Sequence, residues 1–184
     1  MIKLYPTIAF VKPDTNDYPF VGKLVNWWCN SKYYHCELIL GDYWLTVSPD
    51  YGVKLNEIKQ LDTNKYEYVP LKQIDLAQQW YDSILDYIRS EISDDYDTLG
   101  IILNQIFGFN IKTKKWFCSE LVADIIMRLG YEELKGHCSY EFSPQDLYDI
   151  FTGKQVEPRR YSILSRIKRI FNLKKFYISI GKTF

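Results

Sequence analysis

One cysteine in this sequence stands where thiol chemistry is favoured. Cys118 lies in the stretch WFCSEL, at the predicted beginning of an apolar helix. The positive end of a helix dipole stabilises a thiolate, and the free N–H groups of the first turn can receive an oxyanion. Cys118 is therefore a candidate nucleophile, and Ser119 directly after it is a candidate contact to substrate. The alternative is a buried cysteine that only fills apolar space.

A thiol nucleophile requires a base, and the chain contains two histidines, His35 and His137. His137 follows a glycine in a polar turn, whereas His35 lies in a segment of alternating polar and apolar residues. We therefore predict that His35 accepts the proton of Cys118. A histidine with a purely structural role is the alternative. A zinc site built from His35-Cys36 and His137-Cys138 is disfavoured, because adjacent strand residues point in opposite directions. No metal or cofactor is expected.

The segment around His35 predicts a β-hairpin. The stretch YYHCELILGDYWLTVSP alternates and is interrupted by Gly-Asp at 41–42, a two-residue turn. Directly opposed residues share a face. One face then carries the polar residues His35, Glu37, Thr46 and Ser48, and the other carries Cys36, Leu38, Leu45 and Val47. We expect either Glu37 or Thr46 to hold the second ring nitrogen of His35, and Ser48 to contact substrate.

The remaining pattern predicts an α+β fold. Further strands are expected at residues 3–11, 52–58 and 65–71, and helices at 19–30, 74–92, 96–109, 117–129 and 143–150. The helix at 74–92 is amphipathic, with an inner stripe of Leu76, Trp80, Ile84, Leu85 and Ile88. Ser143 and Pro144 are typical of a helix start, and Gly130 is typical of a helix end.

Composition indicates a folded protein. Apolar residues make up 47% of the chain and charged residues 25%, which excludes disordered and collagen-like classes. No apolar run is long enough to span a membrane, and the N-terminal residues lack the pattern of a secretory signal. The four cysteines form no CxxC pair, which indicates free thiols. These features predict a cytoplasmic protein, or a virion protein if the source is viral.

Charge divides the chain unevenly. The net charge is zero, yet residues 151–184 hold nine Lys or Arg and a single Glu. We therefore predict a main domain at residues 1–153 and a basic extension at 154–184. Within it, YSILSRIKRIFNLKKF predicts an amphipathic helix that suits an anionic membrane surface, the acidic main domain or a protein partner, through residues 158–184. Nucleic acid is not expected, because the charge is local and no known module is present.

Five stretches together resemble the circularly permuted branch of the NlpC/P60 papain-like superfamily, the YiiX/YaeF-like cysteine hydrolases, which are related to lecithin:retinol acyltransferase-like proteins. They are FVGKLVNWWCNSKYYHCELIL, LTVSPDYGVKLNEI, YDTLGIIL, WFCSELVADIIMRLGY and SPQDL, in this order over residues 18–150. The resemblance implies a small papain-like barrel in which Cys118 is the nucleophile and His35 the base. It also implies a third polar residue at the position of Thr46. Tyr96 matches a recurrent aromatic residue of the family, which lines the site or donates to an oxyanion; a packing tyrosine is the alternative.

The resemblance implies a function as well. It indicates a thiol hydrolase or acyltransferase that cleaves an amide or ester bond through a thioester, with peptidoglycan-type peptides or lipid acyl groups as substrates. Two departures bear on activity, because the first strand lacks the family's Gly-Asp pair and Tyr34 replaces a small residue before the histidine. The competing hypothesis is a binding or structural subunit of a larger assembly, such as a phage particle, with the same fold and a silent dyad.

Overall fold

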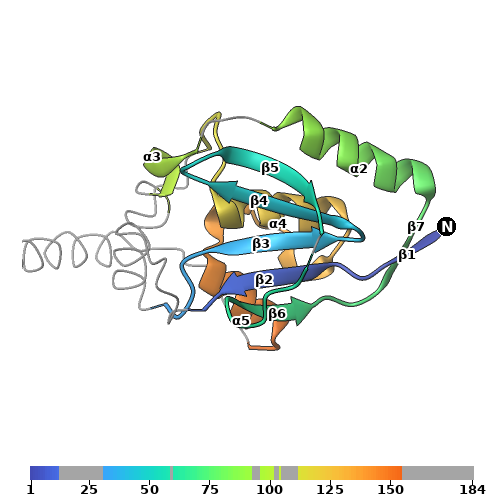
Figure 1. Ribbon diagram of the computed structural model, residues 1–184, viewed down its shortest axis with the longest axis horizontal. Coiled ribbons are helices and arrows are strands. Elements are labelled where there is room, and N and C mark those ends of the chain that lie inside the picture. The colour runs from blue at the N-terminus through green and yellow to red at the C-terminus, as the bar shows by residue number, and fades with distance from the viewer. Residues whose placement is uncertain (13–30, 59, 93–95, 102–103, 105–111, 155–184) are drawn as a thin grey trace, which may run out of the picture.

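The computed structural model describes residues 1–12, 31–58, 60–92, 96–101, 104 and 112–154, and these form an α+β protein (Figure 1). The main antiparallel sheet has the order β5-β4-β3-β2-β6, and β1 pairs with β7 in a second, two-stranded sheet. The strands are β1 (Ile2–Leu4), β2 (Thr7–Val11), β3 (Cys36–Leu40), β4 (Tyr43–Ser48), β5 (Gly52–Glu57), β6 (Tyr66–Pro70) and β7 (Ile74–Leu76). The helices are α2 (Gln78–Ser90), α3 (Thr98–Gly100), α4 (Cys118–Arg128) and α5 (Pro144–Phe151), with the short 3₁₀ helices η2 (Glu132–Leu134) and η3 (Ser139–Glu141).

The predicted hairpin is confirmed, including its register. Leu40 is opposite Tyr43 and Leu38 is opposite Leu45, so continuation of the same ladder sets Glu37 across from Thr46. Gly41 occupies the turn with a φ of 57°, a conformation that glycine adopts without strain. A side chain at Gly41 would also meet the hydroxyl of Tyr81, which donates a hydrogen bond to the carbonyl of Leu40.

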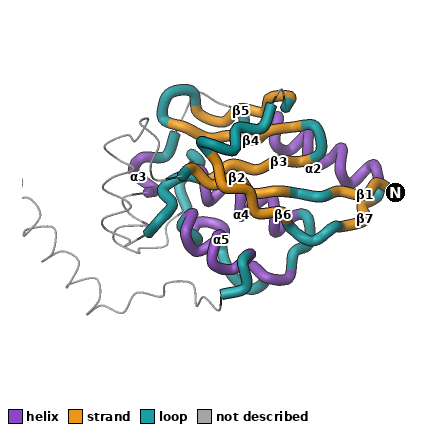
Figure 2. Tube along the Cα trace, turned by 60° about the horizontal axis from the view of Figure 1, so that its bottom comes forward, coloured by secondary structure: helices purple, strands orange, loops and turns teal. Residues whose placement is uncertain are grey.

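The apolar face of the sheet packs against α4. Figures 1 and 2 show α4 and α5 on one side of the sheet, with α4 crossing behind β3. The core between the layers is formed by fully buried side chains of both: Ile8, Phe10, Leu38, Leu45, Val47, Leu121, Val122, Ile125 and Ile126. Because β3 and α4 carry the two candidate catalytic segments, burial of this face also brings those segments together.

Two predicted elements are divided differently in the structure. The strand expected at 3–11 is broken at Pro6 into β1 and β2, since proline cannot donate to a ladder. The helix expected at 74–92 begins only at Gln78, because residues 74–76 pair with β1 as strand β7. The predicted inner stripe is correct for Ile84, Leu85 and Ile88 but wrong for Trp80, which is 52% exposed on the first turn of α2.

Both C-terminal helices begin as predicted. Helix α4 starts at Cys118, and Gly130 follows its end with a φ of 89°. Helix α5 starts with a capping box, in which Ser143 and Asp146 each bond to the other's backbone N–H. Of the helix expected at 96–109 the described part is α3, while the helix expected at 19–30 and the basic extension after Lys154 lie outside the described residues. In the described part of the chain, no helix is long and apolar enough to cross a bilayer.

Candidate active site

The structure brings Cys118 and His35 into contact. His35 directly precedes β3, and Cys118 is the first residue of α4. The packing of α4 on the sheet sets the imidazole near the thiol, so that each group shifts the pKa of the other. The pair predicted from the sequence therefore meets in space.

Glu37 occupies the other side of the imidazole. The Nε2 atom of His35 lies 3.1 Å from Oε1 of Glu37. Thr46 does not orient the imidazole directly, because its hydroxyl instead donates to Oε1 of Glu37 at 2.6 Å. The order of contacts is thus thiol, imidazole, carboxylate, with the threonine behind the carboxylate. This is the arrangement that fixes tautomer and ring orientation in thiol and serine hydrolases.

Aromatic side chains cover the carboxylate of Glu37, which is only 5% exposed. The indole N–H of Trp44 donates to Oε2, and burial together with the charge of Glu37 raises the pKa of Tyr66. The rings of Trp44 and Tyr66 pack edge to face at 5.2 Å between centroids, with Tyr68 next to both. The polar face of the hairpin is therefore closed off from water. The alternation of Trp44 with Thr46, and of Tyr66 with Tyr68, is the sequence signal that could have predicted this cover.

These contacts stabilise opposite charges within the site. Burial lowers the pKa of His35, but the negative charges of Cys118 and Glu37 outweigh it and raise that pKa to about 10. Burial raises the pKa of Glu37, but hydrogen bonds from His35 and its other donors outweigh it and lower the pKa. The pKa of Cys118 is lowered well below the usual thiol value by a hydrogen bond from Cys36 and by the charge of His35, against the effect of burial. The two shifts favour a thiolate and an imidazolium over the neutral pair.

Tyr96 also reaches the sulfur. Its backbone forms a parallel bridge with Trp116, two residues before the nucleophile, which sets its side chain near Cys118. Burial, followed by the negative charge of Cys118, raises the pKa of Tyr96. The hydroxyl is thus a neutral donor beside the thiolate, in a position to influence charge that develops there.

The two serines expected to contact substrate are engaged elsewhere. The hydroxyl of Ser48 accepts from the backbone N–H of Asp50 in the turn between β4 and β5. The hydroxyl of Ser119 is fully buried and donates to the carbonyl of Phe142 at 2.8 Å, which ties α4 to the segment after η3. Both contacts stabilise the fold, and they do not support a substrate-binding role for either hydroxyl.

The nucleophile itself is almost completely covered. Cys118 is 3% exposed, and the side chain of His35 is 15% exposed. Reactive cysteines in enzymes are ordinarily partly exposed. Access to the sulfur is therefore the property that a functional test must measure.

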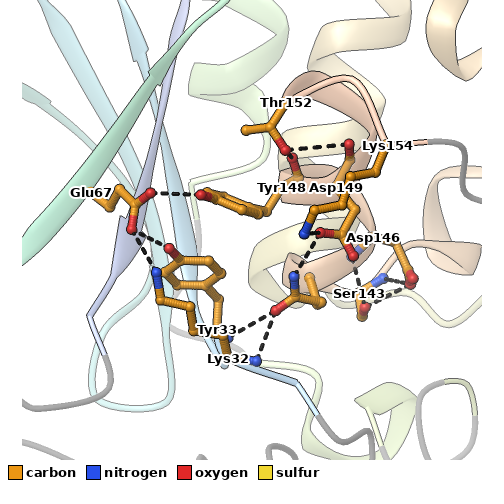
Figure 3. A network of polar contacts seen from close by, with 10 residues as sticks. Lys32, Tyr33, Glu67, Ser143, Asp146, Tyr148, Asp149, Thr152 and Lys154 are labelled. Carbon is orange, nitrogen blue, oxygen red and sulfur yellow. Dashed lines mark hydrogen bonds and ion pairs between the residues drawn. The ribbon is translucent and has the colours of Figure 1, made fainter.

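A polar network anchors the segment that leads into His35 (Figure 3). Glu67 on β6 accepts hydrogen bonds from the hydroxyls of Tyr33 and Tyr148 and from Nζ of Lys32. Burial raises the pKa of Glu67, but these donors outweigh it and lower the pKa to about 2. The side chain of Gln145 on α5 accepts from the backbone N–H groups of the same segment. The chain two residues before the imidazole is therefore fixed to both β6 and α5.

A second buried carboxylate lies in the first turn of α4. Glu120 is 1% exposed, and within the described residues neither of its oxygens receives a hydrogen bond of good geometry. Its nearest cation is Nζ of Lys112, 3.5 Å from Oε1. Burial raises the pKa of Glu120 to about 7, because Lys112 only partly offsets the loss of hydration.

The zinc alternative finds no support in the part of the chain that the structure describes, where no group of three or more His, Cys, Asp or Glu side chains could hold a metal. His137 interacts instead with Glu141, at 3.2 Å from Nδ1 to Oε2.

Comparisons with known proteins find no match, whether against family models, among curated proteins or among solved structures. The function is therefore argued from the geometry of the site and from the order of its elements along the chain.

Proposed function

We propose that the protein is a thiol hydrolase or acyltransferase that resembles the circularly permuted NlpC/P60 enzymes. The observation that carries the proposal is the chain of contacts from Cys118 through His35 to Glu37. The order of elements supports it, since a hairpin bearing the histidine precedes a helix that begins with the cysteine, as in the permuted branch. The sheet packed on α4 is compatible with a small papain-like barrel.

In the proposed reaction the thiolate of Cys118 attacks the carbonyl carbon of an amide or ester. The first-turn N–H groups of α4 and the hydroxyl of Tyr96 stabilise the oxyanion. The imidazolium of His35 then donates its proton to the departing amine or alcohol, which leaves an acyl thioester on Cys118. Neutral His35 next draws a proton from water or another acceptor, which attacks the thioester and frees the thiolate. Glu37 holds the ring throughout and stabilises its charged form.

The substrate classes proposed are peptidoglycan-type peptides and lipid acyl groups, as the family resemblance implies. Both present an acyl carbon next to a leaving nitrogen or oxygen. The basic extension at 154–184 offers an additional contact to an anionic surface or a partner protein, and its residues 155–184 lie outside the described part of the chain.

The proposal is tested by the chemistry of the thiol. Iodoacetamide at neutral pH is expected to alkylate Cys118 faster than the other cysteines, and His35→Ala is expected to abolish the preference. His137→Ala is the matched control, because it removes the other histidine and leaves the dyad intact. A p-nitrophenyl ester is expected to give a burst of phenolate and an acylated Cys118 in the intact protein mass. Equal slow alkylation of all thiols, or rapid alkylation without acylation, would contradict an acyl-transfer enzyme.

One observation favours a second candidate function, which is a binding or structural subunit with the same fold. The sulfur of Cys118 is almost fully buried, as expected of a thiol that serves packing. On this hypothesis acylation by the ester is absent, whereas His35→Ala lowers the free energy of unfolding by removing the charge that faces the buried Glu37.

A further inference from the structure

The hydroxyl of Thr46 and the imidazole of His35 share one oxygen of Glu37. Oε1 lies 2.6 Å from Oγ1 of Thr46 and 3.1 Å from Nε2 of His35, while Oε2 accepts the indole N–H of Trp44. The carboxylate that receives these bonds is 5% exposed, and Thr46 is 6% exposed. Thr46 is therefore buried and lies one contact away from the imidazole.

We propose that Thr46 is a positioning residue, whose hydroxyl keeps the carboxylate of Glu37 charged and in contact with the imidazole of His35. The family resemblance implies a polar residue at this position that meets the histidine directly, so an action through a carboxylate on the neighbouring strand departs from that pattern. The inference deepens the proposed function and rests on it for the role of the imidazole. The contacts that carry it require no acyl substrate.

A single hydrogen fixes the direction of the Thr46 hydroxyl. A threonine hydroxyl has one hydrogen, and at 2.6 Å from an ionised oxygen that hydrogen lies on the bond to Glu37. The hydroxyl of Tyr51, 3.4 Å from Oγ1 of Thr46, is then the donor in the second contact. The Thr46 hydroxyl is thus engaged both as donor and as acceptor, and its hydrogen stays on the carboxylate.

Two neutral donors stabilise the charge of Glu37 without cancelling it. A cation in place of Thr46 or Trp44 would compete with the imidazolium, whereas a hydroxyl and an indole N–H leave the negative charge facing His35. Because the carboxylate is buried, water does not replace a donor that is removed, and an oxygen that loses its donor favours the protonated form. Loss of the Thr46 hydroxyl is therefore expected to shift Glu37 towards its neutral form.

The other titratable groups around this carboxylate keep their charge while it titrates. They are His35 and Cys36 on the same segment, Tyr51 and Lys54 beside Thr46, and Tyr66 and Tyr68 on β6. Phenols and thiols are neutral, and imidazolium and ammonium groups are charged, at the acid pH where a carboxylic acid titrates. A change in the titration of Glu37 therefore reports the loss of its donor.

The experiment compares two substitutions that separate the hydroxyl from the methyl group. Thr46→Val keeps the shape of the side chain and removes the hydroxyl, whereas Thr46→Ser keeps the hydroxyl and removes the methyl group. The side-chain carboxyl carbons of the full-length protein are followed by NMR from neutral to acid pH. In Thr46→Val the midpoint of Glu37 is expected to rise by about one pH unit, a tenfold change in its ionisation constant. In Thr46→Ser it is expected to match the wild type.

Thr152→Val is the matched control, because it removes a hydroxyl that donates to the backbone carbonyl of Tyr148 and not to a carboxylate. The midpoint of Glu37 is expected to be unchanged in this variant. A threonine that serves only packing would give the opposite order, with Thr46→Val unchanged and Thr46→Ser disturbed, and that result would overturn the proposal. Equal midpoints in all the proteins would overturn it as well.

The wild type decides the question even if Thr46→Val does not fold. A hydroxyl proton of Thr46 that is visible by NMR at neutral pH and moves with the titration of Glu37 supports the proposal. A hydroxyl proton that exchanges too fast to be seen, or that is insensitive to this titration, overturns it. No ester is used, so a shifted midpoint without an acyl burst would refute the hydrolase and leave the role of Thr46 standing. A burst with an unshifted midpoint would do the reverse.

Discussion

Glu37 and Glu120 occupy comparable positions, since each follows a dyad residue by two positions and each is buried. Their surroundings differ. Glu37 is hydrogen-bonded to an imidazole, a hydroxyl and an indole N–H, whereas Glu120 has no hydrogen-bond donor of good geometry among the described residues and one lysine at the edge of its reach. The pKa of Glu37 is lowered and that of Glu120 is raised. The donors around a buried carboxylate, not its burial, decide whether it keeps its charge.

The difference matters for the proposed chemistry. A negative charge beside His35 stabilises the imidazolium, so an ionised Glu37 supports the dyad. A negative charge in the first turn of α4 favours the helix but opposes a second negative charge on Cys118 at the same end. Glu120 limits this repulsion because it is partly protonated near neutral pH and pairs with Lys112 when ionised. The two carboxylates thus favour the same ion pair in different ways.

The largest effect is expected when the negative charge of Glu37 is removed. In Glu37→Gln the imidazolium loses its anionic partner, and the pKa of Cys118 rises toward the ordinary thiol value. The rate of Cys118 alkylation at pH 6 is expected to fall on the order of 10²-fold, because that rate follows the fraction of thiolate. The wild-type rate is expected to change little between pH 6 and pH 9, below the raised pKa of His35, whereas the variant rate should climb steeply with pH.

Glu67→Gln provides the matched control for that comparison. It neutralises another carboxylate with several donors, but one that contacts Tyr33 and Tyr148 and not the imidazole. Its alkylation rate at pH 6 is expected to match the wild type. Equal losses in the two variants would mean that Glu37 acts through the fold and not through His35.

The second effect concerns the stability of the fold and its dependence on pH. The folded-state pKa of Glu120 lies above its unfolded value, so the protonated form favours folding. Its contribution is complete below about pH 4, the unfolded pKa, and is lost as pH rises through the folded pKa of about 7, at a cost of about 3–4 kcal/mol. Glu120→Gln removes this loss. The free energy of unfolding is measured by urea denaturation at pH 5 and at pH 8. The stability of the variant relative to the wild type is expected to be greater at pH 8 than at pH 5. A difference between the two proteins that does not change with pH would contradict the assignment.

The smallest effect tests one donor of Glu37. Trp44→Phe keeps an aromatic ring in the cover and removes the indole N–H that donates to Oε2. We expect the free energy of unfolding to fall by about 1–2 kcal/mol, because a hydrogen bond to a charged acceptor is lost from a buried site. Trp80→Phe is the control, because Trp80 is exposed and its indole N–H donates to a neutral acceptor, the backbone carbonyl of Arg128. Similar losses in both variants, determined in urea, would show that indole packing and not the bond to Glu37 is responsible.

Local signals predicted those parts of the fold that neighbouring residues determine. The Gly-Asp turn and strict alternation set the register of β3 and β4, and the apolar periodicity after Cys118 predicted where α4 begins. The extent of α2 was predicted wrongly, because its first residues pair with β1, a strand more than 70 positions earlier in the chain. Such pairing overrides helical periodicity and leaves no local trace.

In the candidate site, too, the features set by neighbouring residues were predictable and those set by distant segments were not. That His35 and Glu37 share a face was visible in the hairpin, and the choice between Glu37 and Thr46 required side-chain geometry. The cover over Glu37 comes partly from β6, which does not pair with β3.

The two ends of the dyad are separated by most of the described chain, and this has a consequence for synthesis. The ribosome completes the hairpin well before it adds Cys118, and a contact between such distant segments forms late, after its loop-closure cost is met. Until then the cysteine lacks its imidazole, and it has the pKa and the slow reactivity of an ordinary thiol. If the proposed chemistry holds, a nascent chain is spared premature acylation, and the reactivity of the thiol reports completed folding.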